Sequence, residues 1–117
     1  MNEKSEKLKL NKDFRRLYGR GRSFVSPVLV TYIMPTKRGV IRYGITTGKK
    51  IGGAVERNRA RRVIDAAFFE CVKDINVKGA DIVFVARTRT VYAKSYNVAE
   101  AMRKHFTEGG LILPQTE

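Results

Sequence analysis

Basic side chains crowd one short stretch of the sequence, GKKIGGAVERNRARRVIDAAF at residues 48–68. Four arginines and one asparagine lie within six residues of it. A guanidinium group suits bidentate contact with phosphate, and an asparagine amide can both donate to and accept from a sugar hydroxyl or a base edge. These residue types at this density indicate a surface that binds a polyanion, with the candidates Arg57, Asn58, Arg59, Arg61 and Arg62.

A helix over residues 55–72 would sort this stretch into two faces at about 100° per residue. The arginines and Asn58 fall on one arc, with Arg57 at the border. Arginines one turn apart repel each other, and a bound anion would offset that cost. A solvated amphipathic helix is the alternative, because charged outer faces are ordinary. The opposite arc is apolar and consists of Ala60, Val63, Ile64, Ala67, Phe68 and Cys71.

Two lysines and two glycines precede this helix. Gly52 and Gly53 would let backbone amides approach a phosphate near the helix N-terminus, and Lys49 and Lys50 would add positive charge there. No GK[ST] element follows at the spacing of a nucleotide-binding P-loop. Lys49 and Lys50 therefore join the candidate polyanion-binding residues.

The formal net charge is +13, and the whole excess lies in residues 1–62, since residues 63–117 carry seven basic and seven acidic side chains. A solvated surface usually mixes its signs, so this concentration favours nucleic acid over a generic basic protein or a membrane-surface binder. No apolar run reaches the length that spans a bilayer, and the N-terminus MNEKSEKLKLNK lacks a signal-peptide core. We therefore expect a cytoplasmic protein with no membrane partner.

The expected elements form a single α+β domain over residues 1–117, an α/β sandwich with a small mixed sheet. Phe14, Leu17 and Tyr18 share one face of a first helix, which is expected to have Asn11 as its N-cap and to end at the glycines 19 and 21. Residues 1–10 are expected to be a flexible basic lead-in. Strands are expected at 28–34, 40–47 and 81–87, a further strand near 45–51, and a last helix from about 95 to 109.

Residues 48–68 closely resemble the arginine-rich signature of the bacterial ribonuclease P protein family. In that signature a strand ends in a KK turn, followed by Gly, Ala-Val, Arg-Asn-Arg, a basic pair and an apolar helix. The sequence departs from it at Gly53, where Asn is common, and at Asp65, where a basic residue is common. The matching residues are Lys49, Lys50, Gly52, Ala54, Val55, Arg57, Asn58, Arg59, Arg61, Arg62 and Phe68.

The resemblance implies the order α-β-β-β-α-β-α and a four-stranded mixed sheet with a left-handed β-α-β crossover, as in the ribosomal protein S5 domain 2-like fold. It implies that the RNA subunit carries the chemistry and requires Mg²⁺, so that the protein supplies no catalytic residue and binds no cofactor of its own. The implied partners are ribonuclease P RNA and precursor tRNA, in a 1:1 protein–RNA heterodimer.

The resemblance also implies a cleft between the first helix and the sheet that holds the single-stranded 5′ leader of precursor tRNA. Aromatic rings in a positive groove suit single strands, which makes Phe14, Arg15 and Tyr18 candidates. The alternative is that both rings belong to the core. Alternation puts only one of Thr31 and Tyr32 on the cleft side, and we name Tyr32 as the candidate although the sequence leaves that choice open.

Three other function classes can be weighed from the residues. A ribosomal or ribosome-associated RNA-binding protein of the same fold is the main alternative. A helix-turn-helix DNA-binding protein would need a helix where residues 28–47 read as strands. A self-sufficient enzyme is disfavoured, because the only cysteine, Cys71, and the only histidine, His105, read as packing residues and cannot form a Cys/His zinc site.

Overall fold

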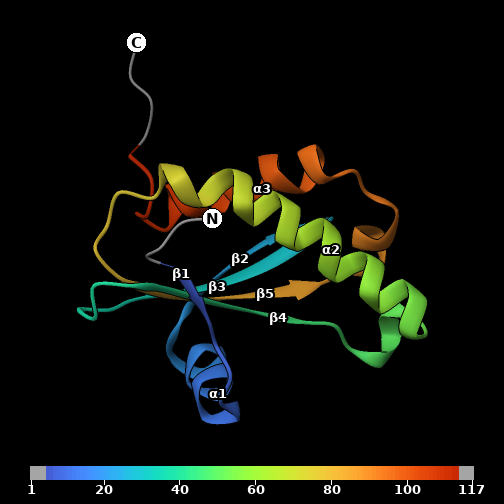
Figure 1. The fold of residues 1–117 in the computed structure, drawn as a ribbon, viewed down its shortest axis with the longest axis horizontal. Helices are drawn as coiled ribbons and strands as arrows, with labels where there is room; N and C mark the ends of the chain where they lie inside the picture. Colours follow the sequence, from blue (N-terminus) through green and yellow to red (C-terminus); the bar gives the residue numbers. More distant parts are fainter. Residues whose placement is uncertain (1–4, 114–117) are drawn as a thin grey trace.

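The computed structural model describes residues 5–113, which form one five-stranded mixed sheet with helices on both of its faces (Figure 1). The strand order across the sheet is β1-β4-β5-β3-β2. β4 runs parallel to β1 and β5, whereas β3 is antiparallel to both β5 and β2. The strands are β1 (Ser5–Lys7), β2 (Arg22–Ser26), β3 (Leu29–Pro35), β4 (Ile41–Thr46) and β5 (Ala80–Ala86).

Two helices cover one face of the sheet, and a single helix lies alone on the other (Figure 1). α2 connects the parallel neighbours β4 and β5, so a β-α-β crossover is present, while its left-handedness stays a prediction. The helices are α1 (Asn11–Arg20), α2 (Ala54–Cys71) and α3 (Ser95–Glu108), with short 3-10 helices η1 (Lys49–Ile51), η2 (Val72–Asp74) and η3 (Thr88–Tyr92).

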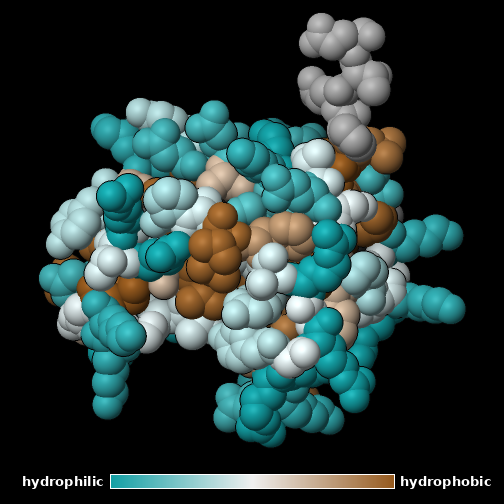
Figure 2. Space-filling model, turned by 180° about the vertical axis from the view of Figure 1, so that it is seen from behind, coloured by the Kyte–Doolittle hydropathy of each residue, from teal (hydrophilic) through white to brown (hydrophobic). Residues whose placement is uncertain are grey.

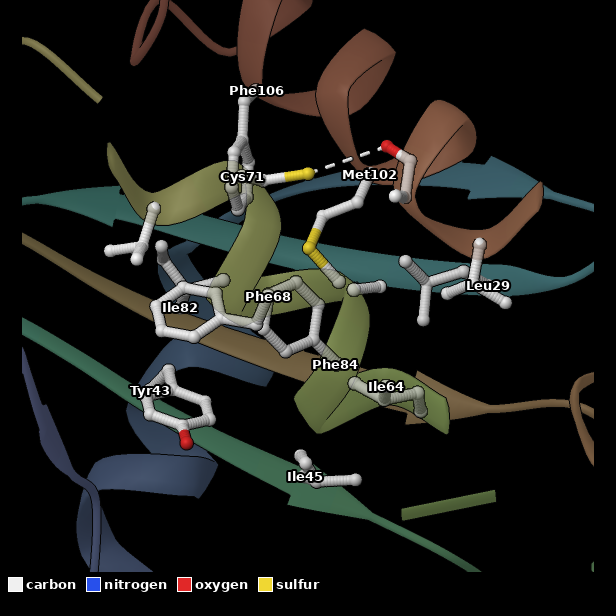
Figure 3. Close-up of a cluster of buried hydrophobic side chains, with 14 of the residues drawn as sticks. Leu29, Tyr43, Ile45, Ile64, Phe68, Cys71, Ile82, Phe84, Met102 and Phe106 are labelled. Carbon is white, nitrogen blue, oxygen red and sulfur yellow. Dashed lines mark hydrogen bonds between the residues drawn. The ribbon is translucent and has the colours of Figure 1, made fainter. Parts of the chain in front are cut away.

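The main core lies between the sheet and the α2–α3 layer. Its centre is aromatic: the Phe68 ring stacks on Tyr43 at 4.0 Å between centroids and meets Phe84 at 5.6 Å (Figure 3). The lone cysteine is fully buried there, and the Cys71 thiol donates to the carbonyl of Ala99 at 3.4 Å. Burial raises the pKa of this thiol to about 11, which suits the packing role expected for it rather than a nucleophile.

The expected number of strands is wrong, because the sheet has five strands rather than four. The further strand expected near 45–51 is absent, since Lys49–Ile51 form the 3-10 helix η1. The remaining strand of the central β-β-β run is instead β2, which precedes β3 in the chain. It is a short edge strand that pairs with β3 through a tight Ser26–Leu29 turn. Its sequence, RSFVS, is too short and too polar for a clear alternation signal.

Part of the segment expected to be a lead-in takes regular secondary structure, while its flexibility stays a prediction. Ser5–Lys7 form β1, and Leu8 is buried beneath α1, while residues 1–4 lie outside the described residues. α1 takes Leu10 as its N-cap and Asn11 as its first residue, and it runs through Gly19 to Arg20. Within residues 5–113, no helix has the length and apolar character needed to cross a membrane.

Candidate nucleic-acid interface

The basic face of α2 points away from the sheet, as the helical arcs predicted. Ala60, Ile64 and Ala67 are fully buried on the inner side. On the outer side Asn58, Arg59, Arg61 and Arg62 are exposed and Arg57 is half-buried. Within the described residues, no hydrogen bond or ion pair engages the side chains of Asn58, Arg59 or Arg62. These groups are therefore free to contact a ligand.

The N-terminus of α2 already has an anion of its own. The Glu56 carboxylate accepts a hydrogen bond from the Gly53 N–H at 2.9 Å, in the favourable first turn of the helix. Gly52 has φ +133°, a conformation that side chains rarely adopt, and a Cβ there would press on Glu56. The glycines thus serve the helix cap, and Lys49 and Lys50 stand exposed on η1 just before it.

Arg61 differs from its neighbours in having an intramolecular partner. Its Nη1 donates to the carbonyl oxygen of Ile45 at 3.1 Å, which ties α2 to β4. One hydrogen bond leaves other guanidinium N–H groups available, since the group carries five. The structure thus brings all seven predicted basic-surface residues onto α2 and η1, although Arg61 is also a structural contact.

Three of the candidate leader residues, Phe14, Tyr18 and Tyr32, gather on the sheet face that α1 covers, which we call the α1 face. Thr31 points away from it, toward α3, where its hydroxyl pairs with His105 Nδ1 at 2.8 Å. Tyr32 therefore lies on the α1 face, and its ring meets Tyr18 edge-on at 5.1 Å. The Tyr18 hydroxyl is hydrogen-bonded to Thr46 Oγ1 at 2.6 Å, yet the side chain is 41% exposed.

Phe14 has a packing role that the sequence left as an alternative. Its half-buried ring lies over Gly44, where a Cβ would collide with the ring, and it joins the small cluster of Leu8, Leu17 and Val83. Arg15, on the outer side of α1, is exposed. Phe14 thus offers at most part of its ring to a ligand, whereas Tyr18 is the more accessible aromatic side chain.

α1 leaves one row of the α1 face open. The register places Val25, Val30, Val85 and Thr46 in line across the sheet, and Val25 is 65% exposed while Val83, one row away beneath α1, is fully buried. The row runs into an open pocket of about 500 Å³ lined by Val25, Arg87 and Arg89 among others. Seen from behind, hydrophobic side chains are exposed among hydrophilic ones above the level of α1 (Figure 2).

A buried ion network fastens α1 to the sheet. The fully buried Asp81 carboxylate accepts from Arg42 at 2.9 and 2.7 Å and from Arg16 at 2.8 Å. Asp13, also buried, lies 3.2 Å from Arg16 and 3.8 Å from Arg42. The hydrogen bond to Asp81 raises the pKa of Arg42 despite partial burial. Arg16, which sits among the basic residues of α1, is therefore a structural residue.

His105 is buried between α3 and the sheet. Its neighbours include Thr31 and the Phe24 ring, 6.0 Å away between centroids. Burial lowers its pKa, because the charged imidazolium would lose its hydration there. A buried neutral histidine with a hydroxyl partner fits the packing role expected from the sequence.

The lowered pKa of His105 predicts that acid weakens the fold. Above the unfolded-state pKa of about 6.5, both states are neutral at this site and its contribution to stability is complete. As pH falls through that value the unfolded chain binds the proton first, so the free energy of unfolding falls toward the lower folded-state pKa. Urea unfolding at pH 7.5 and 5.5 should show this loss, and His105→Gln should reduce it. Equal pH dependence in both proteins would contradict the assignment.

Comparison with known proteins identifies the family. The family model described as Ribonuclease P matches residues 2–109. The chain is 38% identical over 96 residues to the ribonuclease P protein component of Clostridioides difficile, covering 82% of this chain and 84% of that protein. It is also 38% identical over 105 residues to that of Thermoanaerobacter sp. (strain X514), covering 89% of each.

Solved structures agree with the sequence comparison. The Staphylococcus aureus RNase P protein superposes with a TM-score of 0.77 at 27% identity, covering 91% of this chain and 96% of that one. The RNase P protein from Thermotoga maritima shares the fold, with a TM-score of 0.75 at 24% identity over 87% of this chain and 96% of that one. The arginine-rich segment 48–68 lies wholly inside the matched range. The chain belongs to the ribonuclease P protein family.

Proposed function

We propose that this protein is the protein subunit of ribonuclease P, the endoribonuclease that removes the 5′ leader of precursor tRNA. It binds the catalytic RNA with the basic face of α2 and the leader with the α1 face. The RNA subunit carries the chemistry, Mg²⁺ belongs to that subunit, and the protein supplies no catalytic residue. The complex is a 1:1 protein–RNA heterodimer in the cytoplasm.

The observation that carries this proposal is the exposed basic face of α2, where only Arg61 has an intramolecular side-chain partner among the predicted RNA-binding residues within residues 5–113. Asn58, Arg59 and Arg62 are exposed, and no acidic side chain within residues 5–113 pairs with the two arginines. Folding gains nothing from holding like charges together, so their placement is best explained by phosphate contacts that release counterions. Lys49 and Lys50 on η1 extend the same positive surface toward the N-terminus of α2.

The leader role rests on the aromatic pair of the α1 face. Tyr18 and Tyr32 already pack edge-on against each other. A base that stacks on them therefore immobilises few additional side-chain rotamers, which lowers the entropic cost of binding. The half-exposed valine row continues from this pair toward Arg87 and Arg89, which offer charge for a backbone. Arg15 adds a cation on the outer side of α1.

The alternative function is that of a ribosomal RNA-binding protein of the same fold, and it requires no leader-binding site on the α1 face. The family assignment does not favour it, since both the family model and the relatives are ribonuclease P proteins. The two functions also differ in what they require of the open α1 face. In a ribosomal protein the α1 face would serve packing or have no binding role.

The direct test is single-turnover cleavage of precursor tRNA by a bacterial ribonuclease P RNA at low Mg²⁺, with and without the protein. We expect the protein to rescue cleavage, and to do so only for substrates whose leader is several nucleotides long. If the protein rescues cleavage equally for short and long leaders, the α1 face does not bind the leader. RNA binding with no rescue would favour the ribosomal alternative.

Phe14→Leu separates stacking from packing in the leader groove. Leucine keeps an apolar contact over Gly44, so the free energy of unfolding should fall by only about 1 kcal/mol. Loss of one stacked base should weaken leader-dependent substrate affinity by roughly fivefold to a hundredfold. Substrate affinity is measured with long-leader and leaderless precursors, alongside urea unfolding. An affinity loss that is equal for both substrates would mean that Phe14 is a core residue only.

A further inference from the structure

An open pocket of about 510 Å³ lies between the basic face of α2 and the segment that leads into α3. Arg59 and Arg62 line it from α2, and Tyr92 and Lys94 line it from η3 and the turn that follows. Val63 and Ala66 supply apolar surface. Its volume is that of a small-molecule site, and none of its lining residues is acidic.

Tyr92 is held at the rim of this pocket by a rigid turn. Thr90 and Val91 are buried, and the Thr90 hydroxyl donates to the Val28 carbonyl at 2.6 Å and accepts from the Arg87 N–H at 2.8 Å. η3 is thereby fastened to the turn between β2 and β3, and Tyr92 remains 80% exposed. Within the described residues, its hydroxyl has no hydrogen-bond partner and its ring no stacking neighbour.

We propose that this pocket binds one unpaired nucleotide of the catalytic RNA, with its base stacked on Tyr92 and its phosphate held by Arg59, Arg62 and Lys94. An aromatic face beside several cations is the chemistry that captures an unstacked base together with its backbone. A single exposed aromatic ring is ordinary on a protein surface. Tyr92 differs because it adjoins a pocket lined by Arg59 and Arg62, which have no side-chain partner within the described residues. The inference rests on the proposed function and adds a contact outside α2.

The chain contains no tryptophan, so Tyr92→Trp introduces a single fluorescent reporter at the pocket. Titration with ribonuclease P RNA should quench its emission as the base stacks. Tyr96→Trp is the matched control, because Tyr96 is also exposed, at 67%, and lines a different pocket that contains Glu70 and Glu100. Its emission should not respond. Titration with precursor tRNA alone should leave both reporters unquenched.

Affinity measurements complete the test. Tyr92→Ala should weaken binding of ribonuclease P RNA about tenfold without changing the dependence of affinity on salt, because stacking neutralises no phosphate. Tyr92→Phe should bind within about twofold of the parent, and Tyr96→Ala should be unchanged. A silent Tyr92→Trp reporter in a protein that binds the RNA would overturn this inference alone. Failure of the unsubstituted protein to bind that RNA would overturn the proposed function as well, and quenching by precursor tRNA alone would reassign the pocket to the substrate.

Discussion

Asp81→Ala should lower the free energy of unfolding by about 3–5 kcal/mol, the largest stability effect we expect from a single substitution in this fold. Asp81 is fully buried and is the common acceptor for Arg16 on α1 and Arg42 on β4. Removing it leaves the partly buried guanidinium groups of Arg16 and Arg42 with Asp13 as the remaining carboxylate within 4 Å in residues 5–113. The cost arises from stranding those charges away from water rather than from the lost attraction alone.

Urea unfolding followed by circular dichroism measures this effect, with Asp74→Ala as the control. Asp74 forms a comparable ion pair with Arg103 at 3.0 Å, but the two side chains are 47% and 40% exposed. Solvent screens that pair, so its loss should cost no more than about 1 kcal/mol. Equal effects of the two substitutions would show that the Asp81 network adds little to the attachment of α1.

The network also connects stability to the proposed leader groove. α1 carries Arg16 and Asp13 on the side that faces the sheet, and Arg16 lies two residues from both Phe14 and Tyr18 along the helix. If Asp81→Ala loosens α1 before it unfolds the sheet, Tyr18 and Tyr32 lose their fixed geometry first. Leader-dependent affinity should then fall under conditions in which the protein is still folded.

The α2 helix could be predicted almost completely from the sequence, because its two faces depend only on the spacing of residues within the helix. One helical repeat sorts Ala60, Ile64 and Ala67 from the arginines, and the structure buries the first set and exposes most of the second. Burial of a helix face needs only a sheet to pack against, whichever strands that sheet contains. For the same reason the helical repeat alone predicts the basic surface.

Features that depend on distant pairing could not be predicted in the same way. β1 is three residues long and polar, and only the parallel neighbour β4 makes it a strand. Arg42 and Asp81 are 39 positions apart, and no periodicity relates them. Thr31 and Tyr32 were indistinguishable because alternation gives two faces without saying which one α1 covers. The contact with His105 settles that choice.

The double substitution Arg57→Ala, Arg59→Ala should weaken binding of ribonuclease P RNA roughly a hundredfold at physiological salt. Each guanidinium is expected to make charge-assisted contacts with phosphate, worth about 1.5–3 kcal/mol apiece before relaxation. Arg59 is exposed and Arg57 half-buried on α2, and neither forms an ion pair within residues 5–113. Stability should therefore change little, and removal of like charges one turn from their neighbours should even favour the helix slightly.

Salt dependence distinguishes contact from general attraction in this experiment. Losing two phosphate contacts should reduce the slope of log affinity against log salt by about two. Lys73→Ala, Lys104→Ala removes the same charge from exposed positions on η2 and α3, away from the basic face of α2. That control should weaken binding only slightly, through the overall field. Equal losses in the two double variants would mean that the RNA responds to net charge, and unchanged affinity in the arginine variant would mean that α2 is not the RNA-binding face.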